Sequence, residues 1–155
     1  HFMITGSVMN ARYKPLDGVW YNSRFNMGVV ANALAGKEWK LGRADKDRVL
    51  MTGFRYSVVG GQYSTPIDLE ASIAAGEQKE SGTSWSVKGA PVHKLDVVIS
   101  YRVGRPKVNH EFKADVQNVL NAQTTVYNYY DDRSKSIKTV PQLALLPVLQ
   151  YTLRF

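Results

Sequence analysis

The chain ends in seven residues, 149–155, that alternate strictly between apolar and polar side chains (LQYTLRF). A strand with this pattern has one apolar and one polar face, because successive side chains point to opposite sides. Soluble domains usually end in polar, loosely held residues, whereas here the final Phe155 belongs to the apolar row. The pattern is typical of a strand in an outer-membrane barrel wall. The last strand of a soluble sandwich is the alternative.

Similar alternation in earlier segments predicts six strands in total. They cover residues 2–13, 25–41, 49–59, 93–103, 110–120 and 145–155. The connections at 14–24, 60–92 and 121–144 are long, and those at 42–48 and 104–107 are short. Up-and-down barrels of the outer membrane have this asymmetry, with brief turns at the periplasmic rim and long loops at the cell surface. Within the second long connection, Thr65 as N-cap and Pro66 as first helical residue predict a short helix over about 66–75.

Composition narrows the class of protein. Hydrophobic residues make up 44% of the chain, but no apolar run approaches the ~20 residues of a membrane helix. There are no cysteines, which excludes disulfides and thiolate metal sites. The net charge is +7, yet the basic residues are spread along the chain, so a nucleic-acid partner is not expected. The chain begins at His1 within a strand pattern, which we interpret as part of a longer protein.

The strand pattern assigns side chains to two environments. The side chains predicted to face lipid are Leu95, Val97, Ile99, Tyr101, Phe112, Leu149, Tyr151, Leu153 and Phe155. Those predicted to face a wet lumen are Arg55, Lys94, Asp96, Arg102, Lys113, Asp115 and Arg154. Because opposite charges alternate on the second set, we interpret it as a lumenal charge ladder rather than a catalytic acid and base.

Four stretches carry a family resemblance. They are GKEWKLG (36–42), YSTPID (63–68), YR with RPK (101–102 and 105–107) and DVQNVLN (115–121). In this order, and followed by a final strand ending in Phe, they resemble the end of TonB-dependent outer-membrane receptors. The likeness is greatest to those of Bacteroidota with a carboxypeptidase-regulatory-like N-terminal extension, and it covers nearly the whole chain.

The resemblance implies a transmembrane β-barrel of about 22 strands, of which this chain supplies the last six. The plug domain and TonB box of such receptors are absent from these residues. Six strands cannot close a barrel alone, because even small barrels use about eight. The remaining strands must come from elsewhere in the protein or from another chain. The partners implied are membrane lipid and lipopolysaccharide, the rest of barrel and plug, the TonB system, the outer-membrane assembly machinery and a surface lipoprotein.

No catalytic or metal site stands out in the sequence. His1, His93 and His110 are isolated, and no cofactor-binding motif is present, so we expect neither an enzyme nor a cofactor. Ligand contact is more plausible in the long connections, where rings and hydrogen-bonding groups occur together. The candidate ligand-binding residues are Tyr63, Asp68, Trp85, Tyr127, Tyr129 and Tyr130. The alternative is that these side chains pack the loops onto one another.

Three functions follow as hypotheses. The first is energised uptake of a siderophore, glycan or peptide across the outer membrane of a Gram-negative bacterium, by a TonB-dependent receptor. The second is a receptor-like barrel that serves as a scaffold subunit in an outer-membrane assembly or secretion complex. The third, a soluble β-rich binding domain, predicts a monomer in buffer without detergent.

Overall fold

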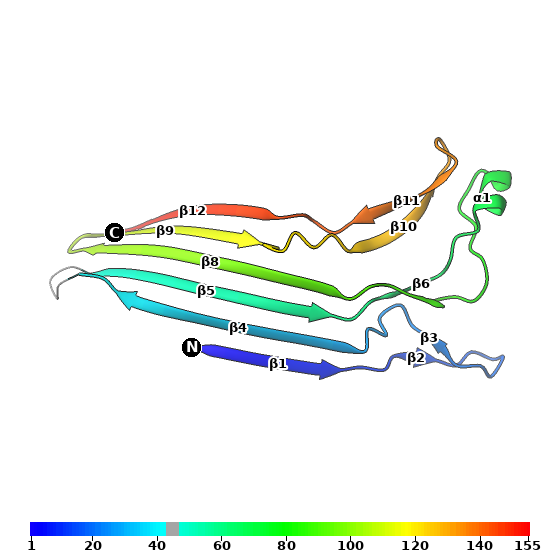
Figure 1. Cartoon of the computed structure of the whole chain (residues 1–155), viewed down its shortest axis with the longest axis horizontal. Helices are drawn as coiled ribbons and strands as arrows, with labels where there is room; N and C mark the ends of the chain where they lie inside the picture. Colours follow the sequence, from blue (N-terminus) through cyan, green and yellow to red (C-terminus); the bar gives the residue numbers. More distant parts are fainter. Residues whose placement is uncertain (43–46) are drawn as a thin grey trace.

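The chain forms one antiparallel sheet of six long strands. The computed structural model describes residues 1–42 and 47–155. The long strands are β1 (Phe2–Val8), β4 (Val29–Lys40), β5 (Arg48–Val59), β8 (Val92–Arg105), β9 (Val108–Gln117) and β12 (Leu146–Arg154). Each pairs with the next one along the chain, and they lie side by side in one layer (Figure 1). The prediction of an all-β, antiparallel, up-and-down sheet is confirmed.

The sheet is open over the described residues. β1 and β12 are its edge strands, and each pairs on one side only. Their free backbone N–H and C=O groups are therefore available to pair with further strands.

The long and short connections lie at opposite rims of the sheet (Figure 1). At the loop rim, the long connections contain β2 (Arg12–Tyr13), β3 (Tyr21–Asn22), β6 (Tyr63–Ser64), α1 (Leu69–Ala75), β7 (Val87–Lys88), β10 (Thr125–Asp131) and β11 (Ser136–Pro141). At the turn rim, β8 and β9 are joined by Pro106 and Lys107 alone. The asymmetry expected from the sequence is present.

The first two strands are shorter than predicted. The predicted strand over 2–13 ends at Val8, and the one over 25–41 begins only at Val29. The Asn26 side chain accepts a hydrogen bond from the Ala11 backbone N–H at 3.0 Å, and Gly28 has a positive φ of 78°. Around these residues the chain leaves the six-stranded sheet, and β2 and β3 pair with each other instead.

The predicted loop over 121–144 contains a hairpin, β10–β11. Tyr129 pairs with Lys138 and Tyr130 with Ile137 across the hairpin. Its β-branched and aromatic residues favour strands, and the intervening Asp132–Lys135 segment supplies the turn. A second unpredicted pair, β6–β7, continues the β5–β8 ladder in the same register, since Val59 pairs with Val92 and Tyr63 with Lys88.

The short helix α1 begins later than predicted. Asp68, not Thr65, is the N-cap, and its Oδ1 accepts the Ala71 backbone N–H at 2.9 Å. Gly76 ends the helix in the left-handed conformation. The described part of the chain contains no helix that is long and apolar enough to cross a membrane.

The sheet has almost no buried apolar core. Among the described residues, the only buried hydrophobic side chains are Val49 and Tyr130, with 7% and 8% of their surface exposed. A soluble domain of this length normally buries a contiguous apolar cluster. The other apolar side chains that the structure describes are exposed or half-buried.

Candidate functional site

Cross-strand register divides the side chains of the sheet between two faces. One row runs Ala35, Phe54, Val97, Val116 and Pro147 across five strands. Because neighbouring residues in a strand point to opposite sides, the next row along lies on the other face. We call these the apolar face, which contains Val97, and the polar face, which contains Asp96.

The apolar face carries the side chains that were predicted to face lipid. These are Leu95, Val97, Ile99, Tyr101, Phe112, Leu149, Tyr151 and Leu153. Leu149 is 83% exposed and Phe112 54% exposed. Phe155 follows the end of β12 and is also exposed. The grouping of these residues is as expected, whereas contact with lipid stays a prediction.

Two hydrogen-bonded Tyr–His pairs lie toward opposite rims of the apolar face. Toward the loop rim, the Tyr56 hydroxyl lies 2.9 Å from Nδ1 of His93, with the ring centroids 6.2 Å apart. Toward the turn rim, the Tyr151 hydroxyl lies 2.8 Å from Nδ1 of His110, also with centroids 6.2 Å apart. In each pair, the tyrosine hydroxyl and the histidine Nδ1 are hydrogen-bonded to each other, and both side chains lie on the apolar face.

All residues predicted to face the lumen share the polar face. They are Arg55, Lys94, Asp96, Arg102, Lys113, Asp115 and Arg154. Arg55 lies directly opposite Asp96 in the β5–β8 ladder, and Arg102 opposite Glu111 in the β8–β9 ladder. Cross-strand pairs of opposite charge stabilise such a face.

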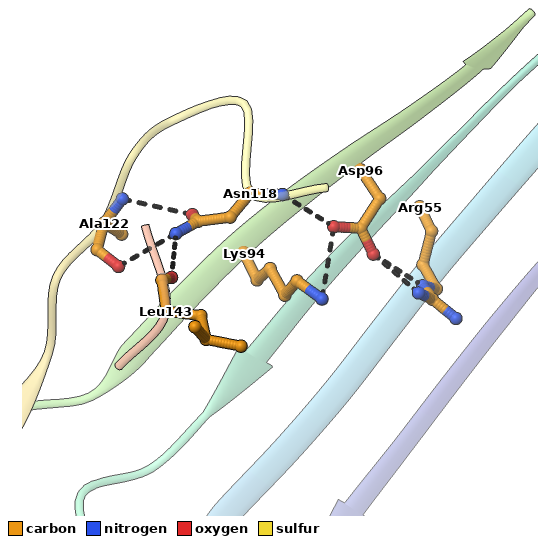
Figure 2. A network of polar contacts seen from close by, with 6 residues as sticks. All are labelled: Arg55, Lys94, Asp96, Asn118, Ala122 and Leu143. Carbon is orange, nitrogen blue, oxygen red and sulfur yellow. Dashed lines mark hydrogen bonds and ion pairs between the residues drawn. The ribbon is translucent and has the colours of Figure 1, made fainter. Parts of the chain in front are cut away.

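Asp96 lies at the centre of a network of polar contacts on the polar face (Figure 2). Only 6% of its surface is exposed. Its Oδ2 accepts hydrogen bonds from Arg55 Nε at 3.1 Å and Nη2 at 2.6 Å. Its Oδ1 accepts the Asn118 backbone N–H at 2.9 Å and lies 3.4 Å from Lys94 Nζ. Since both oxygens are engaged, this carboxylate is occupied in joining β5 and β8 to the end of β9.

Asn118 extends this network into the third long connection (Figure 2). It has a positive φ of 53°, which ends β9. Its Nδ2 donates to the carbonyl oxygens of Ala122 at 3.1 Å and Leu143 at 3.0 Å, and its Oδ1 accepts the Ala122 N–H at 3.1 Å. One buried side chain therefore closes the base of the β9–β12 connection. Sequence reasoning used this residue only within the family likeness, although Asn tolerates the left-handed conformation.

The turn rim of the polar face has a second charged group. Arg154 Nη2 lies 3.8 Å from Glu111 Oε2. A shallow hollow of about 170 Å³ adjoins this pair, lined by Asp47, Arg102, Asn109, Glu111, Thr152 and Arg154. Charges of both signs line it, so no single ligand charge is favoured.

Half of the predicted ligand-binding residues take part in contacts within or between the long connections. Asp68 caps α1. The Trp85 backbone N–H donates to Thr65 Oγ1 at 3.1 Å, and its ring is half-buried. Tyr130 is buried, and its backbone N–H donates to Gln78 Oε1 at 3.2 Å. These contacts match the alternative in which loop side chains pack on one another.

Of the other three candidates, two have exposed rings and the third has a ring that a lysine contacts. Tyr127 and Tyr129 are exposed neighbours on one face of β10, with ring centroids 6.2 Å apart. Tyr63 lies below the Lys88 ammonium, which is 5.7 Å from the ring centroid. The six residues come from two long connections, which meet where the Tyr130 backbone N–H donates to Gln78 Oε1.

Ion pairs fix the tip of the β10–β11 hairpin. Asp131 pairs with Lys138, and Lys135 Nζ lies 2.6 Å from Asp132 Oδ1. The hydrogen bond from Lys138 lowers the pKa of Asp131, and that from Lys135 lowers the pKa of Asp132. The same contacts raise the pKa values of both lysines.

Within residues 1–42 and 47–155, no three His, Asp or Glu side chains are grouped so that they would hold a metal ion. The chain matches no protein-family model, and neither a curated protein nor a solved structure matches it.

Proposed function

We propose that this chain is a wall segment of an outer-membrane β-barrel in a TonB-dependent receptor of a Gram-negative bacterium. The intact receptor takes up a scarce nutrient, such as a siderophore, glycan or peptide, with energy supplied through TonB. The observation that carries the proposal is the exposed apolar face, which crosses all six long strands while almost no apolar core is buried.

Physical chemistry favours lipid as the cover of this face. A contiguous apolar surface of this extent is not stable in water. Hydrocarbon accepts apolar side chains only if backbone polar groups are paired, which a ladder of strands achieves. The two unpaired edges then join further strands of the wall, and the polar face lines the lumen.

The long connections at one rim and the short ones at the other support one orientation of the segment across the membrane. Outer-membrane barrels have short turns on the periplasmic side and long loops outside. On this reading, β10–β11, α1 and the other long-connection elements lie at the cell surface, where the exposed rings of Tyr127 and Tyr129 are available for a nutrient or for a surface lipoprotein. Lipopolysaccharide surrounds the wall, and the last strand is the part that the assembly machinery receives.

A second candidate is a barrel retained as a scaffold subunit of an envelope assembly or secretion complex. The internal contacts of Asp68, Trp85 and Tyr130 favour it, because loops that are packed together offer a firm surface to a partner protein.

Cell fractionation and uptake measurements on a strain lacking the full-length gene test both candidates. The receptor hypothesis predicts that the protein is extracted only from the outer membrane by detergent, and that the deletion strain loses uptake of one nutrient. Normal uptake of every candidate nutrient, together with stable co-purification with a secretion machine, would favour the scaffold. Recovery as a monomer without detergent would contradict both.

A further inference from the structure

The apolar face carries cations only in its turn-rim half. Along β4, β5 and β8, its Lys and Arg residues are Lys37, Arg48 and Arg105. Over the six long strands that the structure describes, no Asp or Glu occupies a position on this face. A cation on an otherwise apolar surface is costly unless water or an anion lies close to it. Because the face itself supplies no carboxylate, the anion must come from outside the sheet.

An aromatic row runs beside these cations. Register places five residues side by side across five strands: Trp39, Leu50, Tyr101, Phe112 and Tyr151. The ring centroids of Phe112 and Tyr151 are 4.9 Å apart. Lys37 Nζ lies 5.4 Å from the centroid of the Trp39 ring, so this lysine extends toward the turn rim. Rings with a polar edge, and lysines that reach along apolar surface, are typical of a boundary between hydrocarbon and water.

The next row toward the turn rim contains guanidinium and imidazole groups. Arg48 pairs with Val103 on β8, and Val103 pairs with His110 on β9. Since adjacent strands are about 4.8 Å apart, Arg48 and His110 are attached about 10 Å from each other, on either side of Val103. Arg105 follows two residues after Val103 on the same face. We call Arg48, Arg105 and His110 the turn-rim cluster, since all three border the surface over Val103.

The turn-rim cluster has donors for an anion. Arg48 and Arg105 are exposed, and neither forms an ion pair with any residue of 1–42 or 47–155. His110 uses Nδ1 for its hydrogen bond to the Tyr151 hydroxyl at 2.8 Å. When that hydroxyl donates, the proton of the neutral ring lies on Nε2. Two guanidinium groups and a ring N–H together suit an anion with several oxygens, and a phosphate group is such an anion.

The depth of the cluster matches the edge of a membrane. Between His93 and Val103, β8 rises by about 33 Å at ~3.3 Å per residue. With the strand tilt of about 40° that is usual in outer-membrane barrels, this corresponds to about 25 Å across the membrane, which is the height of their apolar band. The row of Arg48, Val103 and His110 therefore falls where lipid headgroups begin.

We propose that the turn-rim cluster is a binding site for the phosphate group of an anionic phospholipid. Arg48 and Arg105 pair with the phosphate oxygens, His110 donates to them from Nε2, and the acyl chains lie along Tyr101 toward the membrane centre. Short turns belong to the periplasmic side, whose leaflet is phospholipid, whereas lipopolysaccharide occupies the outer leaflet. The inference rests on the proposed barrel, since only a membrane supplies the lipid. It goes further by naming the headgroup and the residues that select it.

Lipid titration of the full-length protein tests the site. The protein is purified in detergent, freed of lipid and titrated with phosphatidylglycerol or phosphatidylcholine, and bound lipid is counted by native mass spectrometry. We expect the anionic lipid to bind more tightly, and Arg48→Gln/Arg105→Gln to weaken that binding on the order of tenfold, because each cation contributes to the attraction. Arg48→Lys/Arg105→Lys keeps both charges and should retain most of the affinity. Equal binding of the two lipids by the parent protein overturns the site.

A matched control separates the cluster from net charge. Lys40→Gln/Arg102→Gln removes the same charge at the same rim, but from the polar face, and should leave phosphatidylglycerol binding unchanged. Equal losses in the two Gln double variants overturn the site, as does tighter binding of lipopolysaccharide than of phosphatidylglycerol to the parent protein.

Heat-modifiable mobility follows barrel assembly separately. Assembled Arg48→Gln/Arg105→Gln protein with undiminished phosphatidylglycerol binding overturns the site but leaves the barrel proposal standing. A failure of the parent protein to assemble contradicts the barrel and the site together.

Discussion

Leu149 and Gln150 are consecutive residues of β12, and their side chains lie on opposite faces of the sheet. Leu149 is in register with Ala114 on the apolar face, and Gln150 with Lys113 on the polar face. In a membrane wall, Leu149→Arg should cost about 2–4 kcal/mol of unfolding free energy, whereas Gln150→Arg should cost much less. Denaturant titration of the full-length protein in lipid vesicles measures both. Because Leu149 is 83% exposed, a soluble fold predicts a small effect at both positions.

Loss of the Asp96 charge should destabilise the six-stranded sheet. Asp96→Asn keeps the shape of the side chain but removes the charge-assisted bonds to Arg55 and Lys94. We expect a loss of about 1.5–3 kcal/mol in unfolding free energy, because bonds to a charged group are strong and their partners would remain on a half-buried face. Glu38→Gln, on the same face and exposed, is the control and should change little. Equal losses would argue against a central role for Asp96.

Asn118 offers a test of backbone conformation. Both Asn118→Ala and Asn118→Gly remove its side-chain bonds to Ala122 and Leu143. The alanine variant should nevertheless be about 1 kcal/mol less stable than the glycine variant. The reason is that alanine is strained at the positive φ of 53°, whereas glycine is not. The same titration compares the two variants. A more stable alanine variant would show that the left-handed turn is not retained.

Acid should release the tip of the β10–β11 hairpin. The pKa values of Asp131 and Asp132 are lowered in the folded protein. The two carboxylates therefore stabilise the hairpin above the ordinary aspartate pKa of about 3.9, and this stabilisation is lost as the pH falls through the lowered pKa values. Hydrogen exchange over residues 125–141, corrected for its intrinsic pH dependence, should therefore rise below about pH 4. In Asp131→Asn, where the bond to Lys138 is weakened, exchange should already be faster at neutral pH. The β8–β9 ladder is the internal reference.

The cap of α1 should matter locally. Asp68→Ala removes the acceptor for the Ala71 N–H and should cost the helix about 0.5–2 kcal/mol. Faster amide exchange over residues 69–75 is the expected result. Glu70 lies in the first turn, two residues after the cap, and makes no capping bond, so Glu70→Ala should leave exchange over residues 69–75 almost unchanged.

Strand alternation was the part of the fold that local sequence encodes best. In β8, Leu95, Val97 and Ile99 alternate with Asp96 and Val98, and this period of two is sufficient to place both faces before any pairing is known. The same rule placed the charged residues together on the polar face.

Features that depend on distant partners were not predictable in this way. Asn26 ends the first strand by bonding Ala11, and Asn118 anchors Leu143, which lies 25 residues later. Gly36 likewise lies opposite Gly53 only because of the register between β4 and β5. Among the candidate ligand residues, Tyr130 is buried through contacts that no local pattern contains. The hairpin at 125–141 did carry a local signal, in its aromatic and β-branched residues on both sides of a polar turn.

The chain enters β1 and leaves β12 in opposite directions, and every long connection lies at the same rim. Insertions or deletions in those three connections change no register in the ladder. A lineage that inherits this sheet is thus free to diversify the elements at the loop rim while keeping an unaltered ladder.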